Sequence, residues 1–264
     1  MNVFEHEMTE IPANRRRPAA LALVALACLL LPATALAERL PGIDVSRFQG
    51  RINWEQVGAT GEVDYAFVQA SRGSGSDCLV APDRCGPDEF YDRNYARARK
   101  EGIRVGPYHR TFTGGSGVKG VRADARKEAK VFLTEVGEDL RPGDLRPVLD
   151  VESPFGDLGE TNVRRWVRTW LAKVEKKTGA MPIIYTNVSS WNATGNTTRF
   201  AQRGYPLWVA NFDVQRPLVP AENWGGFGWS IWQYTSSGSV DGIAGNVDRN
   251  WLRVPLDSIS VGGG

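Results

Sequence analysis

The sequence is poor in the side chains that bind transition metals. Its 264 residues include three cysteines and two histidines. His6 lies in an N-terminal segment that we interpret below as a leader, which leaves His109 for the rest of the chain. Because a zinc site takes three or four protein or water ligands, we expect no metal site in this protein.

The sequence also lacks an excess of one charge. It has 32 basic and 30 acidic residues, for a formal net charge of +2. So small an excess does not favour binding to nucleic acid or to a membrane surface, although weak attraction to an anionic polymer is compatible with it. We therefore expect no nucleic-acid partner.

Long apolar runs are scarce, and the one near the N-terminus has the pattern of a secretory signal peptide. A basic stretch at 15–17 precedes an apolar run at 19–31, which breaks at Pro32. Ala35-Leu36-Ala37 then forms a small-x-small cleavage site before Glu38. A transmembrane helix needs about 20 apolar residues. We therefore predict a signal peptide over residues 1–37, export from the cell, and no membrane anchor after processing.

Details of export stay open at this stage. A lipoprotein anchor at Cys28 is disfavoured, because Ala25 stands three residues before it and more apolar sequence follows. The stretch before Arg15 is long for a signal peptide, so Met8 is an alternative start. The arginine run is also compatible with twin-arginine export.

Removal of the leader leaves two cysteines, Cys78 and Cys85. An even number of cysteines in an oxidising compartment favours a disulfide. We predict a Cys78–Cys85 disulfide that closes a short loop.

Short β-rich segments alternate with helical patterns from residue 42 onward. Candidate strands are 42–46, 65–71, 104–109, 147–152, 182–187, 206–212, 229–235 and 246–248, and the clearest helices are 89–101, 121–136 and 160–177. Such alternation predicts a parallel sheet. After Asn187 long amphipathic helices cease, so we predict an α/β fold: an irregular TIM-like barrel, (β/α)5(β)3. It would form a single domain over 38–264, with its core at about 41–254, and we expect a monomer.

Two acidic residues end one of these strands. Side chains alternate along a strand, so in 147–152 Asp150 and Glu152 share a face. Barrel enzymes place their catalytic groups at this end of the strands. Two acids in a partly apolar site do not both ionise easily, which supplies a proton donor beside an ionised partner, as glycosidases require. The alternative interpretation is a pair that caps a helix or binds a neighbouring arginine.

Further acids and aromatic residues favour the catalytic interpretation. Asp44 ends the first strand and Asp248 lies in the last strand, which neighbours the first in a closed barrel. Aromatic residues at other strand ends could stack on sugar rings, although each alone is more typical of a core: Tyr108, Tyr185, Trp208, Trp232 and Tyr234.

With these residues in view, the sequence resembles the family 25 glycoside hydrolases from about Gly42 to Trp251. That family comprises lysozymes that cleave peptidoglycan between N-acetylmuramic acid and N-acetylglucosamine. The shared motifs are Gly42-Ile43-Asp44-Val45-Ser46, Phe48-Gln49-Gly50, Tyr65-Ala66-Phe67-Val68, Gly106-Pro107-Tyr108-His109, Leu149-Asp150-Val151-Glu152, Leu207-Trp208-Val209-Ala210, Trp232-Gln233-Tyr234 and Val247-Asp248. The resemblance implies an irregular barrel of five β/α units and three further strands.

The resemblance also implies roles for the site residues. Glu152 would be the general acid, and Asp150 would stabilise or orient the 2-acetamido group of the substrate, whose carbonyl acts as an internal nucleophile. Asp44 and Asp248 would maintain the protonation and geometry of the pair. The expected substrate is peptidoglycan, cofactors are not expected, and candidate sugar contacts are Tyr108, Tyr185, Trp208, Trp232 and Gln233.

Two positions depart from the family pattern. Arg72 stands where relatives often have an acid, and Arg110 stands where many have an aromatic residue. Both fall near the predicted rim of the site. They reflect either drift of a subsite or two solvated cations, or else they contact carboxylates of the muramyl lactate or stem peptide.

Three alternatives remain at this stage. A catalytically silent glycan-binding protein is disfavoured because all four acids are present, and a chitinase is disfavoured because the D-x-x-D-x-D-x-E run is absent from 144–152. Clustered acids can hold Mg²⁺ or Ca²⁺, but cleavage by paired carboxylates needs no metal. The spacing of Asp150 and Glu152 leaves both retention and inversion of the anomeric configuration open.

Overall fold

The computed structural model of the protein describes residues 1, 39–74, 85–137 and 140–263. Cys78 and almost all of the predicted signal peptide lie outside the described residues. The predicted disulfide and the predicted leader therefore stay predictions.

Eight strands close into a barrel. They are β1 (Leu40–Val45), β2 (Tyr65–Arg72), β4 (Arg104–Arg110), β5 (Val148–Asp150), β6 (Ile183–Thr186), β7 (Leu207–Ala210), β8 (Ile231–Gly238) and β9 (Val247–Leu252). Neighbouring strands pair in parallel except that β9 runs antiparallel to both β1 and β8. The pairing of β1 with β2 closes the sheet, and this confirms the predicted α/β irregular barrel.

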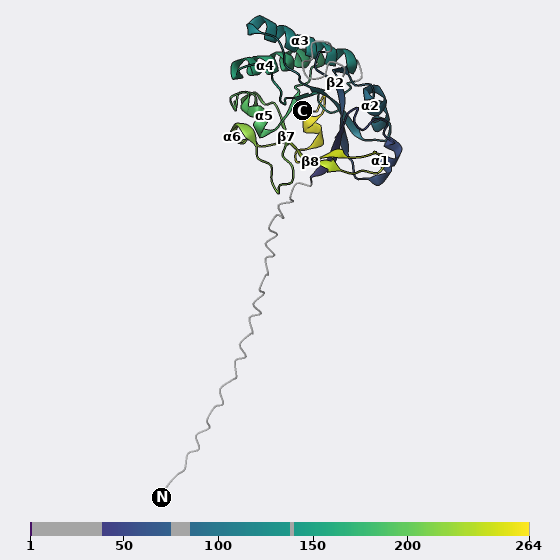
Figure 1. The fold of residues 1–264 in the computed structure, drawn as a ribbon. Helices are drawn as coiled ribbons and strands as arrows, with labels where there is room; N and C mark the ends of the chain where they lie inside the picture. Colours follow the sequence, from purple (N-terminus) through teal and green to yellow (C-terminus); the bar gives the residue numbers. More distant parts are fainter. Residues whose placement is uncertain (2–38, 75–84, 138–139, 264) are drawn as a thin grey trace. The chain divides into compact units, whose positions relative to one another are not determined.

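The described helices concentrate in the first five units (Figure 1). They are α1 (Trp54–Thr60), α2 (Tyr91–Lys100), α3 (Gly117–Val136), α4 (Glu160–Thr178), α5 (Val188–Asn192) and α6 (Pro220–Gly225). The predicted change after residue 187 is confirmed, because α5 and α6 are each a turn or two long. Within the described residues, no helix is long and apolar enough to cross a membrane.

Several element bounds differ from the prediction. The strand β5 ends at Asp150, so Glu152 lies two residues past the strand instead of inside it. The last strand extends to Leu252, beyond the predicted 246–248. A two-residue strand, β3 (Gly86–Pro87), pairs with β2 outside the barrel and was not predicted. These differences arise where hydrogen bonds between distant segments, which periodicity does not register, set the ends of a strand.

The alternation of side chains along the strands divides the core into two layers. One layer fills the barrel and includes Phe67, Val148 and Trp208, whereas the other lies between the strands and the helices and includes Ala66 and Leu149. Close packing inside the barrel explains Gly42, where a Cβ atom would lie 2.3 Å from the Tyr65 ring. The Gly-Ile-Asp motif is therefore partly a packing requirement.

His109 belongs to the outer layer and contributes to packing. Its ring is fully buried, stacks on Trp170, and lies within hydrogen-bond distance of Ser71 Oγ and Glu128 Oε2, both at 2.9 Å. Burial lowers the pKa of His109 to about 3 and raises that of Glu128, so both side chains stay neutral. Ser71, His109 and Glu128 thus join β2, β4 and α3 and face no solvent, despite their resemblance to a hydrolytic triad.

Candidate active site

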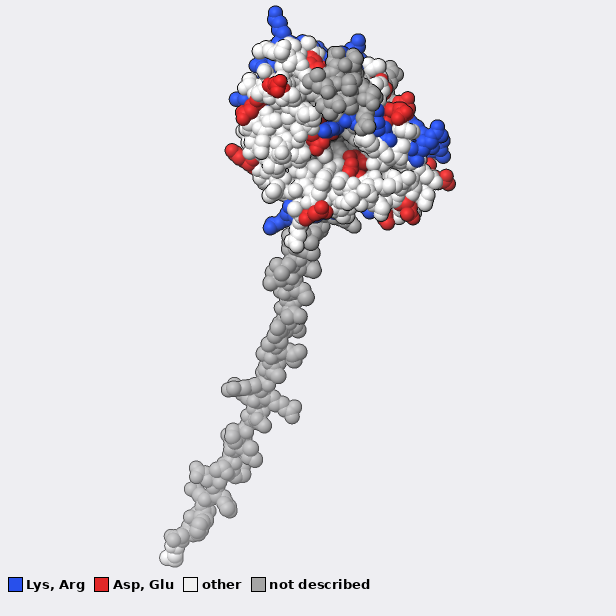
Figure 2. Space-filling model, viewed as in Figure 1, with Lys and Arg blue, Asp and Glu red and all other residues white. Residues whose placement is uncertain are grey.

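The four predicted acids meet at the carboxyl ends of the parallel strands. Asp44, Asp150, Glu152 and Asp248 line one hollow of about 250 Å³ together with Tyr108, Tyr185, Trp208, Gln233, Arg72 and Arg110. Acidic and basic atoms lie side by side near the centre of the face that Figure 2 shows. The barrel thus brings together residues from positions 44 to 248 of the chain, whereas the described linings of two larger hollows contain no acidic residue.

Arg110 contacts both members of the central acidic pair. Its Nη1 lies 3.2 and 3.3 Å from the two carboxylate oxygens of Asp150 and 2.5 Å from Glu152 Oε2. Its Nη2 donates to the carbonyl oxygen of Ser153 at 3.1 Å. One guanidinium thus bridges the two carboxyl groups, and Asn187 Nδ2 donates to the other oxygen of Glu152 at 3.0 Å.

Asp150 and Glu152 differ in their environment. The side chain of Asp150 is 8% exposed and that of Glu152 is 24% exposed. Burial raises the pKa of Asp150 to about 8, Arg110 opposes that rise, and the charge of Glu152 adds to it. Near neutral pH the pair therefore carries a proton.

The second acidic pair lies across the closing strands of the barrel. Asp44 on β1 is opposite Asp248 on β9. Burial, and then the charge of Asp248, raises the pKa of Asp44 well above its usual range. Burial also raises the pKa of Asp248, to about 6, while its hydrogen bond with Asp44 lowers it. Asp44 is therefore the protonated member of this pair.

Asp44 is held by a chain of hydrogen bonds inside the barrel. Its Oδ2 accepts from Gln233 Nε2 at 2.9 Å and from Asn250 Nδ2 at 2.8 Å. The hydroxyl of Tyr185 donates to Gln233 Oε1, and the indole of Trp208 donates to Asn250 Oδ1, both at 2.8 Å. These bonds fix the acid at the bottom of the hollow.

Comparison with known proteins accounts for this arrangement. Residues 43–243 match the family Glycosyl hydrolases family 25. The chain belongs to glycoside hydrolase family 25. It is therefore a glycoside hydrolase, as the sequence motifs predict.

Similar proteins match this chain over most of its length. The chain is 35% identical to the uncharacterized protein YegX of Escherichia coli (strain K12) over 240 residues, 87% of this chain and 78% of YegX. It is 34% identical to lysozyme M1 of Streptomyces globisporus, over 79% of this chain and 66% of that protein. Among solved structures, the lysozyme of Streptomyces coelicolor superposes with a TM-score of 0.69 at 30% identity, covering 84% of this chain and 95% of the other.

Trp232 does not line the hollow of this family 25 enzyme, which corrects one predicted sugar contact. Its neighbours Ile231 and Gln233 point into the barrel, so alternation along β8 directs Trp232 outward. There its indole donates to the carbonyl oxygen of Asn211 at 2.8 Å and its ring packs against Trp229. Trp232 is therefore a core residue.

Trp208 and Tyr185 lie at the hollow but are largely enclosed. Trp208 is 2% exposed, stacks on Phe67 with ring centroids 4.7 Å apart, and meets the Tyr185 ring edge-on at 4.8 Å. These contacts make Trp208 a wall of the site more than an open platform for a sugar. Tyr108 and Tyr185, 9% and 8% exposed, reach the hollow with part of each ring.

The guanidinium groups of the two unusual arginines both lie over the Phe112 ring but differ in their polar partners. The guanidinium of Arg72 lies over the Phe112 ring, 4.8 Å from its centroid, and its Nε has no acceptor among the described residues. Arg110 instead binds the acids of the enzyme itself. Contact of Arg72 or Arg110 with a carboxylate of the substrate stays a hypothesis, and for Arg110 such a contact would compete with its ion pairs to Asp150 and Glu152.

Four residues of the site were missed as functional candidates. Phe48 and Phe212 line the hollow and are 70% and 39% exposed, which is unusual for phenylalanine. Asn187 holds Glu152, and Asn250 holds Asp44. Phe48 follows the first acidic strand and could have been found from its position, whereas an asparagine carries no comparable signal.

The acids of the hollow are not grouped as a metal site. Within the described ranges, no cluster of three or more His, Cys, Asp or Glu side chains is arranged to hold a metal ion. Arg110 occupies the position between Asp150 and Glu152 where a cation would bind them.

Proposed function

We propose that this protein is an exported N-acetylmuramidase. It hydrolyses the β-1,4 bond between N-acetylmuramic acid and N-acetylglucosamine in peptidoglycan. The observation that carries the proposal is the Asp150–Glu152 pair at the end of β5, within a hollow bordered by aromatic rings. Support also comes from relatives named for this activity, which include lysozyme M1 and the N,O-diacetylmuramidase of Chalaropsis sp, 25% identical over 79% of this chain.

Glu152 is the general acid in this proposal. It is the more exposed member of the pair and lies past the end of β5, where it can reach a glycosidic oxygen. Protonation of that oxygen turns the departing sugar into a neutral alcohol while positive charge develops at the anomeric carbon.

Asp150 orients the 2-acetamido group of the muramyl residue. Its buried position beside Glu152 suits a hydrogen bond to the acetamido N–H, which directs the carbonyl oxygen at the anomeric carbon. Attack by that oxygen forms a cyclic intermediate, which water then opens with Glu152 as the base. Asp44 and Asp248 line the same hollow and maintain the protonation and geometry of the Asp150–Glu152 pair.

Arg110 holds the acidic pair in position before the substrate binds. Both carboxylate oxygens of Glu152 accept hydrogen bonds, one from Arg110 and one from Asn187, so one contact has to open before Glu152 can present a proton to the substrate. The Arg110–Glu152 contact therefore opens when the proton of the pair resides on Glu152 and the glycosidic oxygen approaches, and it re-forms once Glu152 has delivered that proton and become a carboxylate. Before that transfer Arg110 stays paired with Asp150, which is then the ionised member of the pair.

The exposed rings of Phe48 and Phe212 suit sugar binding at the mouth of the hollow. The C–H faces of a sugar stack on an aromatic ring, and both rings are open to solvent. Tyr108, Tyr185 and Gln233 line the deeper part of the hollow and are the residues that we assign to the sugar at the cleaved bond.

The acid assignment is tested by Glu152→Gln, with the exposed Glu55→Gln on α1 as the matched control. General acid catalysis contributes about 10²–10⁴-fold. Lysis of purified peptidoglycan should fall by about that factor for Glu152→Gln at an unchanged melting temperature, and should stay the same for Glu55→Gln. Full lysis by Glu152→Gln would refute the assignment.

The bond specificity is tested by mass spectrometry of the released muropeptides. A muramidase leaves N-acetylmuramic acid at the new reducing end. Products that end in reducing N-acetylglucosamine would contradict the proposal and indicate a glucosaminidase.

Export is tested separately. The mature protein in the culture medium should begin at Glu38, one residue after the predicted cleavage site, and should sediment as a monomer. A mass that includes residues 1–37 would contradict the leader assignment.

A further inference from the structure

A strongly basic surface lies on α3, α4 and the segment around the short helix η2 (Ala201–Arg203), outside the barrel. The helix α3 carries five basic and three acidic residues, and α4 carries six basic and two acidic residues. The whole chain has a net charge of only +2. Basic charge is therefore concentrated here, and the rest of the molecule is net acidic.

Two adjoining hollows run along this surface. One, of about 970 Å³, lies between α3 and α4, and the other, of about 670 Å³, lies between α4 and η2. Arg168 and Arg203 line both, so the two hollows form one continuous groove, which we term the basic groove. Its other basic lining residues are Arg122, Arg126, Lys130, Arg164, Arg165, Lys173, Lys176, Lys177 and Arg199.

Acidic residues are missing from the lining of the basic groove in the described part of the chain. The nearby acids are used elsewhere. Glu128 is buried against His109, Asp124 accepts from the indole of Trp166, and Glu175 accepts from the hydroxyl of Tyr205. Glu160 is the exception, at 3.4 Å from Arg164.

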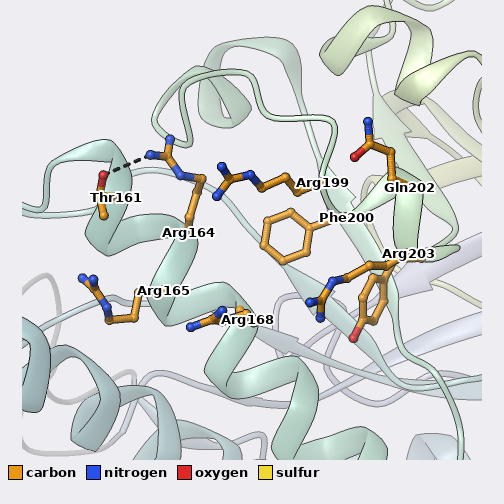
Figure 3. A pocket seen from close by; sticks show the side chains of 9 residues that line it. Thr161, Arg164, Arg165, Arg168, Arg199, Phe200, Gln202 and Arg203 are labelled. Atoms are coloured by element: carbon orange, nitrogen blue, oxygen red, sulfur yellow. Dashed lines mark hydrogen bonds between the residues drawn. The ribbon is translucent and has the colours of Figure 1, made fainter.

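Three arginines at one end of the groove are free to bind a ligand. Figure 3 shows Arg168, Arg199 and Arg203 around the Phe200 ring. All three side chains are exposed, and their guanidinium groups form no hydrogen bond or ion pair with the described residues, although the backbone N–H of Arg199 donates to Thr197 Oγ1. Arg164 differs, because it donates to the Thr161 hydroxyl at 3.0 Å and to a backbone carbonyl.

This arrangement is unfavourable without a ligand. Like charges spaced three or four residues apart on a helix destabilise it by about 0.2–0.5 kcal/mol for each pair. Such spacing relates Arg164 to Arg168 on α4, and on α3 it relates Arg122 to Arg126 and Arg126 to Lys130. An anion in the groove would relieve this repulsion.

We propose that the basic groove binds a linear phosphodiester polymer of the bacterial cell wall. Guanidinium groups pair with phosphate in a bidentate manner, which favours phosphate over carboxylate at a site rich in arginine. From Arg164 to Lys177 the groove follows α4 for about 20 Å, at 1.5 Å for each residue, which accommodates several charges of a polymer. The choice of a wall polymer over a nucleic acid rests on the proposed function.

The position of the groove relates it to catalysis. Thr161 and Arg164, in the first turns of α4, line its α4–η2 end. The helix α4 follows the loop that begins just after Glu152. A polymer in the groove would therefore hold the catalytic edge of the barrel against the wall to which the polymer is attached.

The binding test uses poly(glycerol phosphate) as the probe and fluorescence anisotropy as the readout. The variant Arg168→Gln/Arg199→Gln/Arg203→Gln should lose at least about tenfold in affinity at 0.1 M salt. Its log–log salt slope should be shallower by about 2–3, because each lost phosphate contact contributes about 0.7–0.9. The control Arg51→Gln/Arg97→Gln/Lys100→Gln removes the same charge from another exposed basic surface and should change affinity less than twofold.

Three results would overturn the proposal. The first is an equal loss in the two triple variants, or no loss in either. The second is equally tight binding of poly-L-glutamate, which would indicate a general anion surface. The third is tighter binding of single-stranded DNA of the same charge.

Activity measurements on the same variants distinguish a failure of the groove proposal from a failure of the proposed function. Hydrolysis of a soluble glycan fragment by the groove variant should match that by the unaltered protein. Lysis of walls that carry the phosphate polymer should fall several-fold, and lysis of walls stripped of it should not. Because the binding assay contains no cleavable glycan, a wrong bond assignment would leave the binding result unaffected.

Discussion

At the scale of single residues, Arg110 is the position that most changes the interpretation of the site. In sequence it departs from the family pattern and lies near the rim. In the structure its guanidinium bridges Asp150 and Glu152 at 2.5–3.3 Å. The alternative interpretation of the Asp-x-Glu pair, an ion pair with a neighbouring arginine, thus describes contacts that the structure contains. These contacts are compatible with a catalytic role for the same two acids.

Replacement of Arg110 by leucine should move the pH dependence of catalysis. A nearby cation lowers the pKa of a carboxyl group, by about 1–3 units when it is close, so its removal should raise the pKa of Asp150 above about 8. Activity that needs a protonated pair is lost above that pKa. The alkaline limb of the kcat/KM profile, measured on a soluble fragment, should therefore shift to higher pH.

Arg72→Leu is the control for this experiment. Arg72 lowers the pKa of Asp150 less than Arg110 does. Its removal should therefore shift the alkaline limb by a smaller amount. A limb that stays in place in Arg110→Leu, or moves further in Arg72→Leu, would contradict the role assigned to Arg110.

At the scale of secondary structure, α6 has an unexpected handedness. Ala221, Glu222, Asn223 and Trp224 all have φ between 53° and 56°, in the left-handed region. Left-handed turns cost roughly 1–2 kcal/mol for each L-residue. Burial of Trp224, whose indole donates to the carbonyl oxygen of Tyr205 at 2.8 Å, offsets that cost.

Glu222→Gly tests the handedness of α6. Glycine adopts positive φ without the steric penalty of a Cβ atom, so this exposed substitution should leave the free energy of unfolding unchanged or raise it by up to about 1 kcal/mol. The matched substitution Ala96→Gly, exposed within the right-handed α2, should instead lower it by about 1 kcal/mol. Equal losses in chemical denaturation would show that α6 is right-handed.

At the scale of the whole molecule, burial of acidic residues at the catalytic end of the barrel makes their ionisation unfavourable. Burial raises the pKa values of Asp44, Asp150 and Asp248 above those of an unfolded chain. Between about pH 4 and pH 8 the folded state therefore binds more protons than the unfolded state. By linkage, the free energy of unfolding should fall as the pH rises through this window.

Asp150→Asn should remove part of this pH dependence. The variant should melt at a higher temperature than the unaltered protein at pH 8, and the difference should shrink towards pH 4, where Asp150 is protonated in both states. Each kcal/mol corresponds to about 2–4 °C for a domain of this size. The exposed Asp157→Asn serves as the control. Destabilisation by Asp150→Asn at pH 8 would contradict the direction of the pKa shift.

The sequence by itself determined the architecture of the barrel and the positions of most of the acidic residues in the site. Alternating patterns of period 2 and 3.6 are local, and they identified the eight strands and the change after residue 187. The same periodicity placed Asp150 in the barrel interior, and the order of the strands placed Asp44 beside Asp248. Local pattern suffices for these features because an element that buries one face has apolar residues that recur with its own period along the chain.

Only the tertiary structure decided the contacts between distant segments. Trp232 faces outward because of the register of β8, and Arg110 reaches across from β4 to the acids that end β5. The basic groove arises because α3 and α4 pack side by side, which a net charge of +2 conceals. Distances between side chains on different elements depend on the closure of the barrel, and no spacing within one segment encodes them.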